Sequence, residues 1–209
     1  MDDTAEALAR GRELLAQRQP AKALAIFDAL VQQNPDDVEA HLGRVAALLY
    51  MGEPQFALAA CDAALARQPA HPDALSLKCW ALRSLRRYDE AEEVVDQQLQ
   101  TSPESAELWY TKAQMLIPED RWAEAADALD MALSCDPEMC DAWISKGNVL
   151  LQMGDSANAL SVFDRALVLQ PGNREAQSGR AQARTAWGAT YTVGLLPDLL
   201  ELLSALFSR

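Results

Sequence analysis

Apolar residues recur three and four positions apart along most of the chain, in stretches of about 13 residues that would each form roughly 20 Å of helix. Short polar turns separate paired stretches, at Gln19-Pro20, Gly52-Glu53-Pro54, Arg87-Tyr88, Arg121-Trp122 and Gly154-Asp155. Pro20 and Pro54 suit the first turn of the helix that follows, because the N–H that proline lacks has no partner there. The pattern predicts an all-α protein built from pairs of antiparallel helices.

The pattern repeats with a period of 34 residues through five successive repeats. Three columns keep this interval: Pro35, Pro69, Pro103, Pro137 and Pro171; Ala23, Ala57, Ala91, Ala125 and Ala159; Leu14, Leu48, Leu82, Leu116 and Leu150. Each proline is expected to stop the second helix of its repeat and to direct the chain into the next. One helix pair cannot bury its apolar face alone, so we expect stacked repeats to build the core.

The repeated motif resembles that of the tetratricopeptide repeat family, where a large, a small and a large apolar residue are followed by Ala, a second large apolar residue and Pro. The best match has Trp143, Gly147, Leu150, Ala159, Phe163 and Pro171. Within residues 1–173 the repeats are 4–37, 38–71, 72–105, 106–139 and 140–173, followed by a capping helix over 174–189 and an apolar tail over 190–209. The resemblance implies a right-handed α-solenoid, the superhelix of this family.

Two stripes of side chains can be separated on the first helix of each repeat. Positions four, eight and eleven should pack inside, with Trp109 and Trp143 in the core. Positions two, five, nine and twelve form what we call the inner stripe, which in the family that the sequence resembles lines a concave groove for the ligand. The inner stripe comprises Ala5, Leu8, Arg12, Leu15; Glu39, Leu42, Ala46, Leu49; Asp73, Ser76, Trp80, Arg83; Glu107, Tyr110, Gln114, Ile117; Asp141, Ile144, Asn148 and Leu151.

The inner stripe predicts which residues contact a partner. Trp80 is a large aromatic residue at a place without a core role in the family motif, and exposed Trp and Tyr are frequent binding hot spots. We expect Trp80→Ala to weaken binding and to leave melting nearly unchanged; the alternative is that Trp80 packs on a neighbouring helix. The predicted groove residues are Leu42, Leu49, Tyr50, Asp73, Trp80, Arg83, Glu107, Tyr110, Gln114, Asp141, Ile144 and Asn148.

Position two carries a carboxylate in successive repeats, at Glu39, Asp73, Glu107, Asp141 and Glu175. Each acid could simply complement the helix dipole in the first turn. Alternatively, the acids form a rail along the groove that faces a basic segment of the partner. Some members of the family clamp a chaperone's C-terminal carboxylate with Lys, Asn and Arg; the matching places here hold Leu8, Arg12, Gly43, Asp73 and Leu77, so that clamp is absent.

Composition and charge narrow the class of partner. Half of the residues are hydrophobic but only 6% are aromatic, because the apolar content is mostly Ala and Leu, both good helix formers. The formal net charge of −13 disfavours nucleic acid, whose binding depends on Lys and Arg at the phosphates, and equally disfavours an anionic membrane. A neutral to basic protein or peptide is the expected partner.

The residues that could support catalysis or metal binding do not form a recognisable motif. Cys61, Cys79, Cys135 and Cys140 make no C-x-x-C pair, and with His41 and His71 they give no metal-ligand spacing. The cysteines are expected to be small buried thiols in a reducing compartment. Phosphate-loop, nucleophile-elbow and H-E-x-x-H motifs are missing from the sequence. We therefore expect no enzyme activity and no cofactor.

The segment 194–207 is the most hydrophobic in the sequence, and Pro197-Asp198 resembles a helix start. It could fold back on the solenoid, pair with a second copy, enter a neighbour's groove or lie on a membrane. We prefer docking within the chain or a homo-oligomer through residues 195–207. With the polar start Met1-Asp2-Asp3 and no run of ~18 apolar residues, a cytoplasmic interaction scaffold is expected; the alternative is a self-assembling or membrane-associated assembly factor.

Overall fold

The computed structural model describes residues 2–188 and is entirely α-helical over that range apart from turns and one short 3-10 helix, so the predicted fold class is confirmed. The predicted tail over 190–209, including residues 195–207, lies outside the described residues. The helices are α1 (Asp2–Ala16), α2 (Pro20–Gln33), α3 (Val38–Tyr50), α4 (Pro54–Arg67), α5 (Pro72–Ser84), α6 (Tyr88–Thr101), α7 (Ala106–Leu116), η1 (Ile117–Glu119), α8 (Trp122–Cys135), α9 (Cys140–Gln152) and α10 (Ser156–Leu169), and residues 174–188 are helical too.

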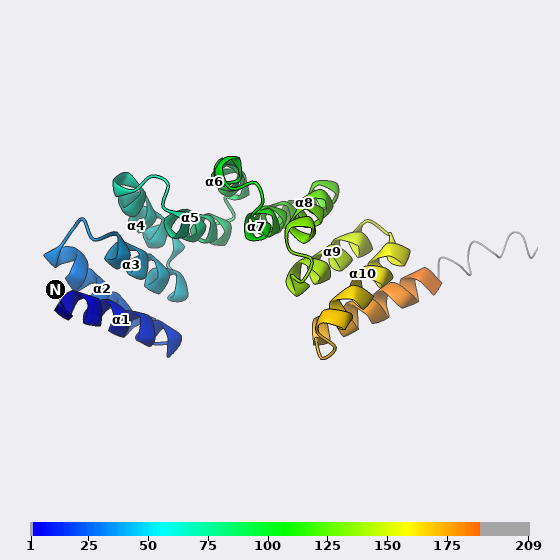
Figure 1. Cartoon of the computed structure of the whole chain (residues 1–209), viewed down its shortest axis with the longest axis horizontal. Coiled ribbons are helices and arrows are strands. Elements are labelled where there is room, and N and C mark those ends of the chain that lie inside the picture. Colours follow the sequence, from blue (N-terminus) through cyan, green and yellow to red (C-terminus); the bar gives the residue numbers. More distant parts are fainter. Residues whose placement is uncertain (1, 189–209) are drawn as a thin grey trace, which may run out of the picture. The chain divides into compact units, whose positions relative to one another are not determined.

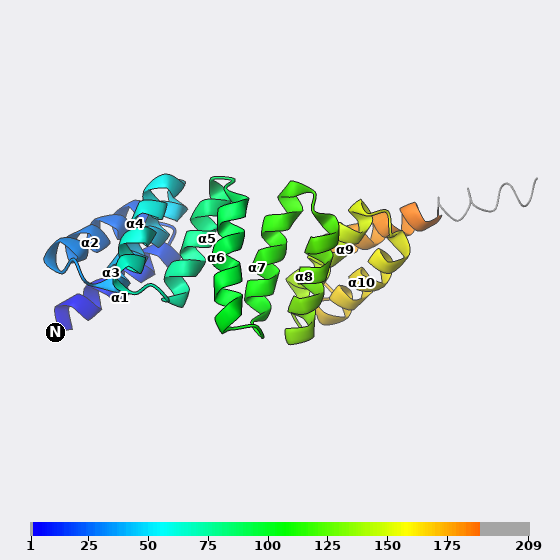
Figure 2. The same ribbon diagram turned by 90° about the horizontal axis from the view of Figure 1, so that it is seen from above.

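The helices follow one another in pairs, each pair inside one predicted repeat (Figures 1 and 2). The chain divides into two compact units, residues 1–103 and residues 104–209, called here the N-terminal and the C-terminal unit. In the N-terminal unit each helix packs on the next one in the chain, and the first helices α1, α3 and α5 also contact one another in order. None of the helices in residues 2–188 is long and apolar enough to cross a membrane.

The first helix of every repeat ends in the same hydrogen-bonded turn. Position fifteen has a positive φ in all five repeats, at Arg18, Gly52, Arg86, Asp120 and Gly154. In the second repeat Gly52 N–H donates to Leu49 at 3.0 Å and Glu53 N–H donates to Leu48 at 2.9 Å. This pair of bonds satisfies the last carbonyls of the helix and turns the chain into the second helix. Only Gly52 and Gly154 adopt the left-handed conformation without a steric cost.

Phenylalanine and glycine fit together where repeats meet. The ring of Phe27 in α2 occupies the space beside Gly11 and Gly43, where an added Cβ would lie 2.5 Å and 2.2 Å from ring carbons. Phe163 in α10 has the same relation to Gly147 and Gly179. Both rings are fully buried, so these glycines are needed for close packing rather than for backbone freedom.

An ion pair links the second helix of one repeat to the first helix of the next. Asp62 binds Lys78 at 2.8 Å, 16 residues further along. The same spacing joins Asp28 to Arg44 at 2.7 Å, Asp130 to Lys146, and Asp164 to Arg180 at 2.6 Å. The pairs are partly exposed and so are individually weak, and the same spacing recurs at four junctions.

Position four is anchored to the preceding proline in the second and fifth repeats and in the helix over 174–188. The indole N–H of Trp143 donates to the Pro137 carbonyl at 2.9 Å, and His41 Nε2 donates to Pro35 at 2.8 Å. Gln177 replaces the large residue expected at this position, yet its amide donates to Pro171 at 2.9 Å. Trp109 and Trp143 are half-buried and pack against core clusters, in agreement with their predicted place.

Candidate partner-binding groove

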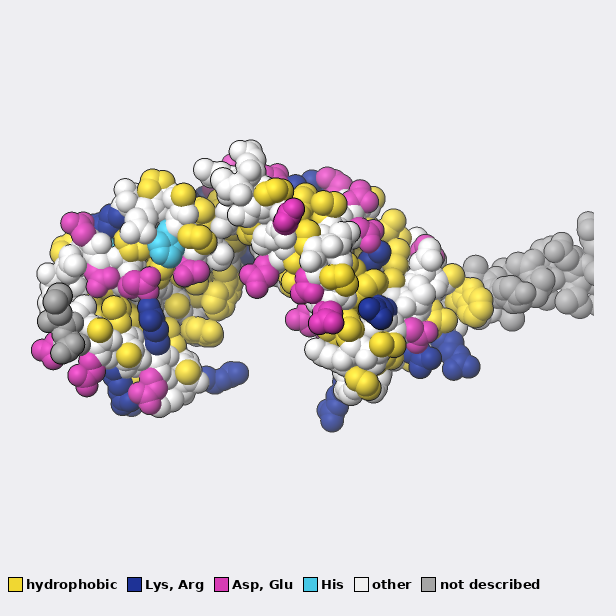
Figure 3. Space-filling model, in the orientation of Figure 1, with side chains coloured by type: hydrophobic (Ala, Val, Ile, Leu, Met, Phe, Trp, Pro, Cys, Tyr) yellow, Lys and Arg dark blue, Asp and Glu magenta, His cyan; other side chains and the backbone are white. Residues whose placement is uncertain are grey.

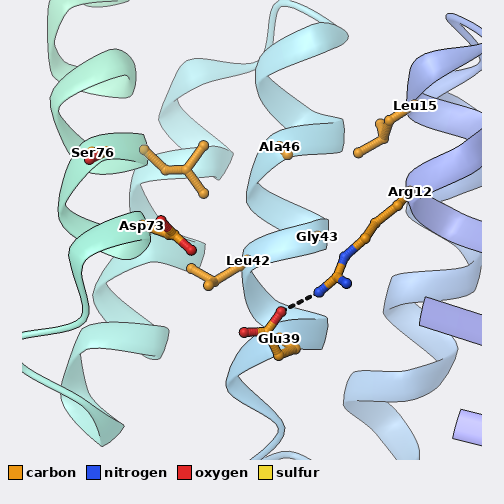
Figure 4. Close-up of a pocket in the computed structure, with 9 residues that line it drawn as sticks. Arg12, Leu15, Glu39, Leu42, Gly43, Ala46, Asp73 and Ser76 are labelled. Atoms are coloured by element: carbon orange, nitrogen blue, oxygen red, sulfur yellow. Dashed lines mark hydrogen bonds and ion pairs between the residues drawn. The ribbon is translucent and has the colours of Figure 1, made fainter. Parts of the chain in front are cut away.

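A cavity of about 440 Å³ opens on the face of the N-terminal unit where α1, α3 and α5 lie side by side (Figure 4). Seven of its nine lining residues belong to the inner stripe, because that stripe is the face left free after positions four, eight and eleven have packed inside. The lining residues are Arg12 and Leu15 from α1, Glu39, Leu42, Gly43 and Ala46 from α3, and Asp73, Ser76 and Leu77 from α5.

The lining combines aliphatic walls with charged groups. Arg12 of α1 crosses to α3 and pairs with Glu39, and both side chains remain about half exposed (Figure 4). Asp73 of α5 projects toward Leu42 of α3, and the Asp73 side chain is exposed (Figure 4). No hydrogen bond or ion pair within residues 2–188 engages the Asp73 carboxylate. The cavity therefore offers aliphatic surface beside a carboxylate that has no partner in the described part of the chain.

An aromatic pair lies one helical turn beyond Ser76, and one of its members, Trp80, belongs to the inner stripe. Trp80 of α5 meets Tyr50 of α3 edge to face, with ring centroids 5.4 Å apart. Tyr50 is 60% exposed, whereas Trp80 is half-buried against the core cluster that contains Val45 and Leu49. The structure thus brings two predicted groove residues together, and Trp80 packs on a neighbouring helix, which is the alternative to an exposed hot spot.

Two predicted groove residues, Leu49 and Ile144, have little exposed surface. Leu49 is 8% exposed and Ile144 is 4% exposed, and each belongs to a core cluster. Position twelve of α3 and position five of α9 are therefore largely covered by their own unit, and neither side chain lines the cavity. Their contact with a partner stays a prediction. Leu42 is also largely buried, but it contributes to the cavity lining.

The remaining predicted groove residues do not line the cavity. Arg83 lies on α5 and is half-buried. In the C-terminal unit, the hydroxyl groups of Tyr110 and Ser145 lie 3.5 Å apart, and Asn148 donates to Glu175 at 3.2 Å. The other predicted members there are Glu107 and Asp141, which are exposed, and Gln114, which is half-buried.

Sequence reasoning did not recognise the contact between position nine of one repeat and position two of the next. Arg12 reaches Glu39 and Asn148 reaches Glu175, and the two partners are 27 residues apart in both cases. The spacing is visible in the sequence, because both positions belong to the inner stripe. The two contacts show that Glu39 and Glu175, two acids of the predicted rail, are paired within the chain.

None of the cysteines lines the cavity. Burial raises the pKa of Cys61 to about 12 and that of Cys79 to about 11, so both thiols stay protonated at neutral pH. Cys140 is buried too, and only Cys135 is exposed, which confirms the predicted burial for three of the four. Within residues 2–188 no three His, Cys, Asp or Glu side chains are grouped to hold a metal ion.

Family models and solved structures agree on the type of repeat. One model described as "Tetratricopeptide repeat" matches residues 48–115 and 82–146, and a second with the same description matches residues 8–72 and 144–187. No curated protein matches the sequence. Together the model matches extend over most of the described range.

Three solved structures illustrate the likeness in fold. MamA from Desulfovibrio magneticus RS-1, in a form starting at its residue 41, has a TM-score of 0.72 and 20% identity, over 83% of this chain and 98% of that one. TTC0263 from Thermus thermophilus has a TM-score of 0.71 and 21% identity, over 87% of this chain and 99% of that one. YrrB, described as a TPR protein with an unusual peptide-binding site, has a TM-score of 0.65 and 18% identity, over 84% of this chain and 90% of that one. At these identities the likeness concerns the fold alone.

Proposed function

Because the chain belongs to the tetratricopeptide repeat family, whose members are protein-interaction scaffolds, we propose that it holds a peptide or a helix of a partner protein in the groove formed by α1, α3 and α5. The observation that carries this proposal is the cavity of about 440 Å³ on the inner stripe. A cavity of this size accommodates one or two side chains of a guest while the aliphatic walls exclude water.

The charge of the chain favours a neutral to basic guest. Acidic side chains lie among hydrophobic ones on the visible face of each unit (Figure 3). With a formal net charge of −13, the chain repels acidic partners and attracts basic ones over several ångströms. A peptide-binding site is also described for YrrB, whose fold is similar, and this use of the fold supports the proposal.

The test is a peptide selection followed by a matched pair of variants. Peptides would be selected from a random display library on the full chain, and their affinities measured by fluorescence polarisation. Ala46 lines the cavity, so Ala46→Trp should fill it and weaken binding about tenfold or more. Ala59 is an exposed position on α4, so Ala59→Trp should leave the affinity unchanged.

A second blocking variant guards against a folding defect in the first. Ser76 lines the cavity but is exposed, so Ser76→Trp obstructs the groove with less disturbance of the core. Circular dichroism would confirm that each variant is folded. Selected peptides that bind both blocking variants as tightly as the original chain would show that the groove is not the binding site.

A further inference from the structure

A link between successive repeats recurs on the inner face. The side chain at position nine reaches the carboxylate at position two of the next repeat, from Arg12 to Glu39 and from Asn148 to Glu175. In the first case the carboxylate is paired with a cation, and in the second it accepts a hydrogen bond from an amide. The link therefore shows how a donor at position nine is placed against the carboxylate at position two of the next repeat.

Asp73 occupies the same column without such a donor. The residue 27 positions before it is Ala46, whose side chain ends at Cβ and has no polar group. Both residues line the cavity, and the space that a longer side chain at position 46 would take remains open (Figure 4). Asp73 thus lacks a donor from position nine at the junction where the cavity lies.

We propose that the cavity takes a lysine or arginine side chain of the partner, whose cation pairs with Asp73 as Arg12 pairs with Glu39. This inference rests on the proposed function, because it names the chemistry of the guest in the same groove. Leu42 and Leu77 line the path to the carboxylate and suit the methylene stem of a long basic side chain.

The charges of the lining favour an organic cation over other ligands. Glu39 and Asp73 contribute −2 and Arg12 contributes +1, so the cavity carries −1 and disfavours an anionic guest. A divalent metal ion prefers six or more oxygen ligands, whereas Asp73 is the one carboxylate of the lining that Arg12 does not engage. A single basic side chain matches this single carboxylate.

The test uses small probes and does not depend on a selected peptide. Full-length protein labelled with ¹⁵N would be titrated with n-butylguanidinium and, separately, with n-butylurea, which has nearly the same shape but no charge. We expect n-butylguanidinium to shift the amide signals of Gly43, Ala46 and Asp73, and to bind about threefold to fivefold more tightly than n-butylurea. Raising the salt concentration should reduce this difference, since Asp73 is exposed.

Two carboxamide variants form a matched control. Asp73→Asn should bring the two probes to equal affinity, whereas Asp141→Asn, at position two of α9, should leave the preference intact. Ala46→Arg should supply an internal partner for Asp73 and displace n-butylguanidinium. Equal binding of the two probes by the unmodified chain, or a preference that survives Asp73→Asn, would overturn the proposal.

The two proposals fail in different ways. If selected peptides are blocked by Ala46→Trp but bind equally well after their Lys and Arg are replaced by norleucine and citrulline, the groove is the site and the cation pairing is wrong. Alternatively, n-butylguanidinium could bind more tightly than n-butylurea through Asp73 while Ala46→Trp leaves the affinity of every selected peptide unchanged. The cation site would then stand alone and the proposed function would fail.

Discussion

The rings of Tyr50 and Trp80 meet edge to face, with centroids 5.4 Å apart and planes at 87°. The contact joins the last residue of α3 to the middle of α5, so it links two successive repeats. Edge-to-face pairs of this kind stabilise by about 0.5–1.5 kcal/mol beyond the area that they bury. Trp80 therefore supports the stacking of the N-terminal unit.

We predict that Trp80→Ala lowers the free energy of unfolding by about 2 kcal/mol, because it removes the aromatic contact and part of the cover of the core beneath. This replaces the expectation, based on sequence, that melting would stay nearly unchanged. Urea denaturation followed by circular dichroism measures the effect. Tyr50→Ala, at a mostly exposed position, should cost less. A Trp80→Ala variant as stable as the original chain would show that the packing is unimportant.

The sequence was sufficient to predict the helices, the turns and the inner stripe, since each depends on a periodicity that five repeats confirm. It was not sufficient to predict which stripe residues remain open. Leu49 is buried because α5 lies against α3, and periodicity gives no distance between neighbouring first helices. The cavity likewise depends on Ala46 and Asp73 lying on adjacent helices at a separation that only the structure supplies.

Some missed features were visible in the sequence. The period of 34 aligns an aspartate column with a column of basic residues 16 positions later, as in Asp62 and Lys78. The columns are Asp28, Asp62, Asp96, Asp130 and Asp164, and Arg44, Lys78, Lys112, Lys146 and Arg180. Apolar columns predict the core, whereas the charged columns predict the ion pairs that join one repeat to the next at four junctions.

A second prediction concerns the close packing of Phe27 on Gly43. Gly43→Ala should lower the free energy of unfolding by about 1–3 kcal/mol, because the new Cβ would lie 2.2 Å from the buried ring. In a Phe27→Leu background the same change should cost much less, since the smaller side chain leaves room. Gly172→Ala is the control, as nothing lies within 4 Å of the added Cβ. Equal costs of Gly43→Ala in both backgrounds would contradict the steric explanation.

A third prediction follows from the left-handed residue that ends each first helix. Arg86 has φ 58°, where an L side chain is strained, while Gly52 at the equivalent place has φ 78°. Arg86→Gly should therefore raise the free energy of unfolding by about 0.5–1 kcal/mol, and Gly52→Ala should lower it by about 1 kcal/mol. Urea midpoints of the two variants would show opposite shifts; a loss of stability in both would mean that the turn conformation is not the determining factor.

The last prediction concerns alkaline pH and the buried thiol of Cys61. Burial, and secondarily the neighbouring Asp62, raises its pKa from 9.0 to about 12, so the unfolded chain loses this proton at a lower pH than the folded chain. The stability contributed by the protonated thiol is complete below pH 9 and is lost as the pH rises toward 12. Between pH 9 and 10.5 the loss should amount to about 1 kcal/mol or more.

Cys61→Ala removes this titration and should make the fall in stability over that pH interval smaller, even though the variant is less stable at pH 8 because a buried atom has been deleted. Cys135→Ala is the matched control, since Cys135 is exposed and its removal should leave the pH dependence unchanged. Lys and Tyr side chains ionise in the same range, but they are common to all three proteins and cancel in the comparison. Urea unfolding at pH 8, 9 and 10.5 gives the three slopes, and identical slopes for Cys61→Ala and the original chain would mean that the Cys61 thiol titrates alike in the folded and unfolded states.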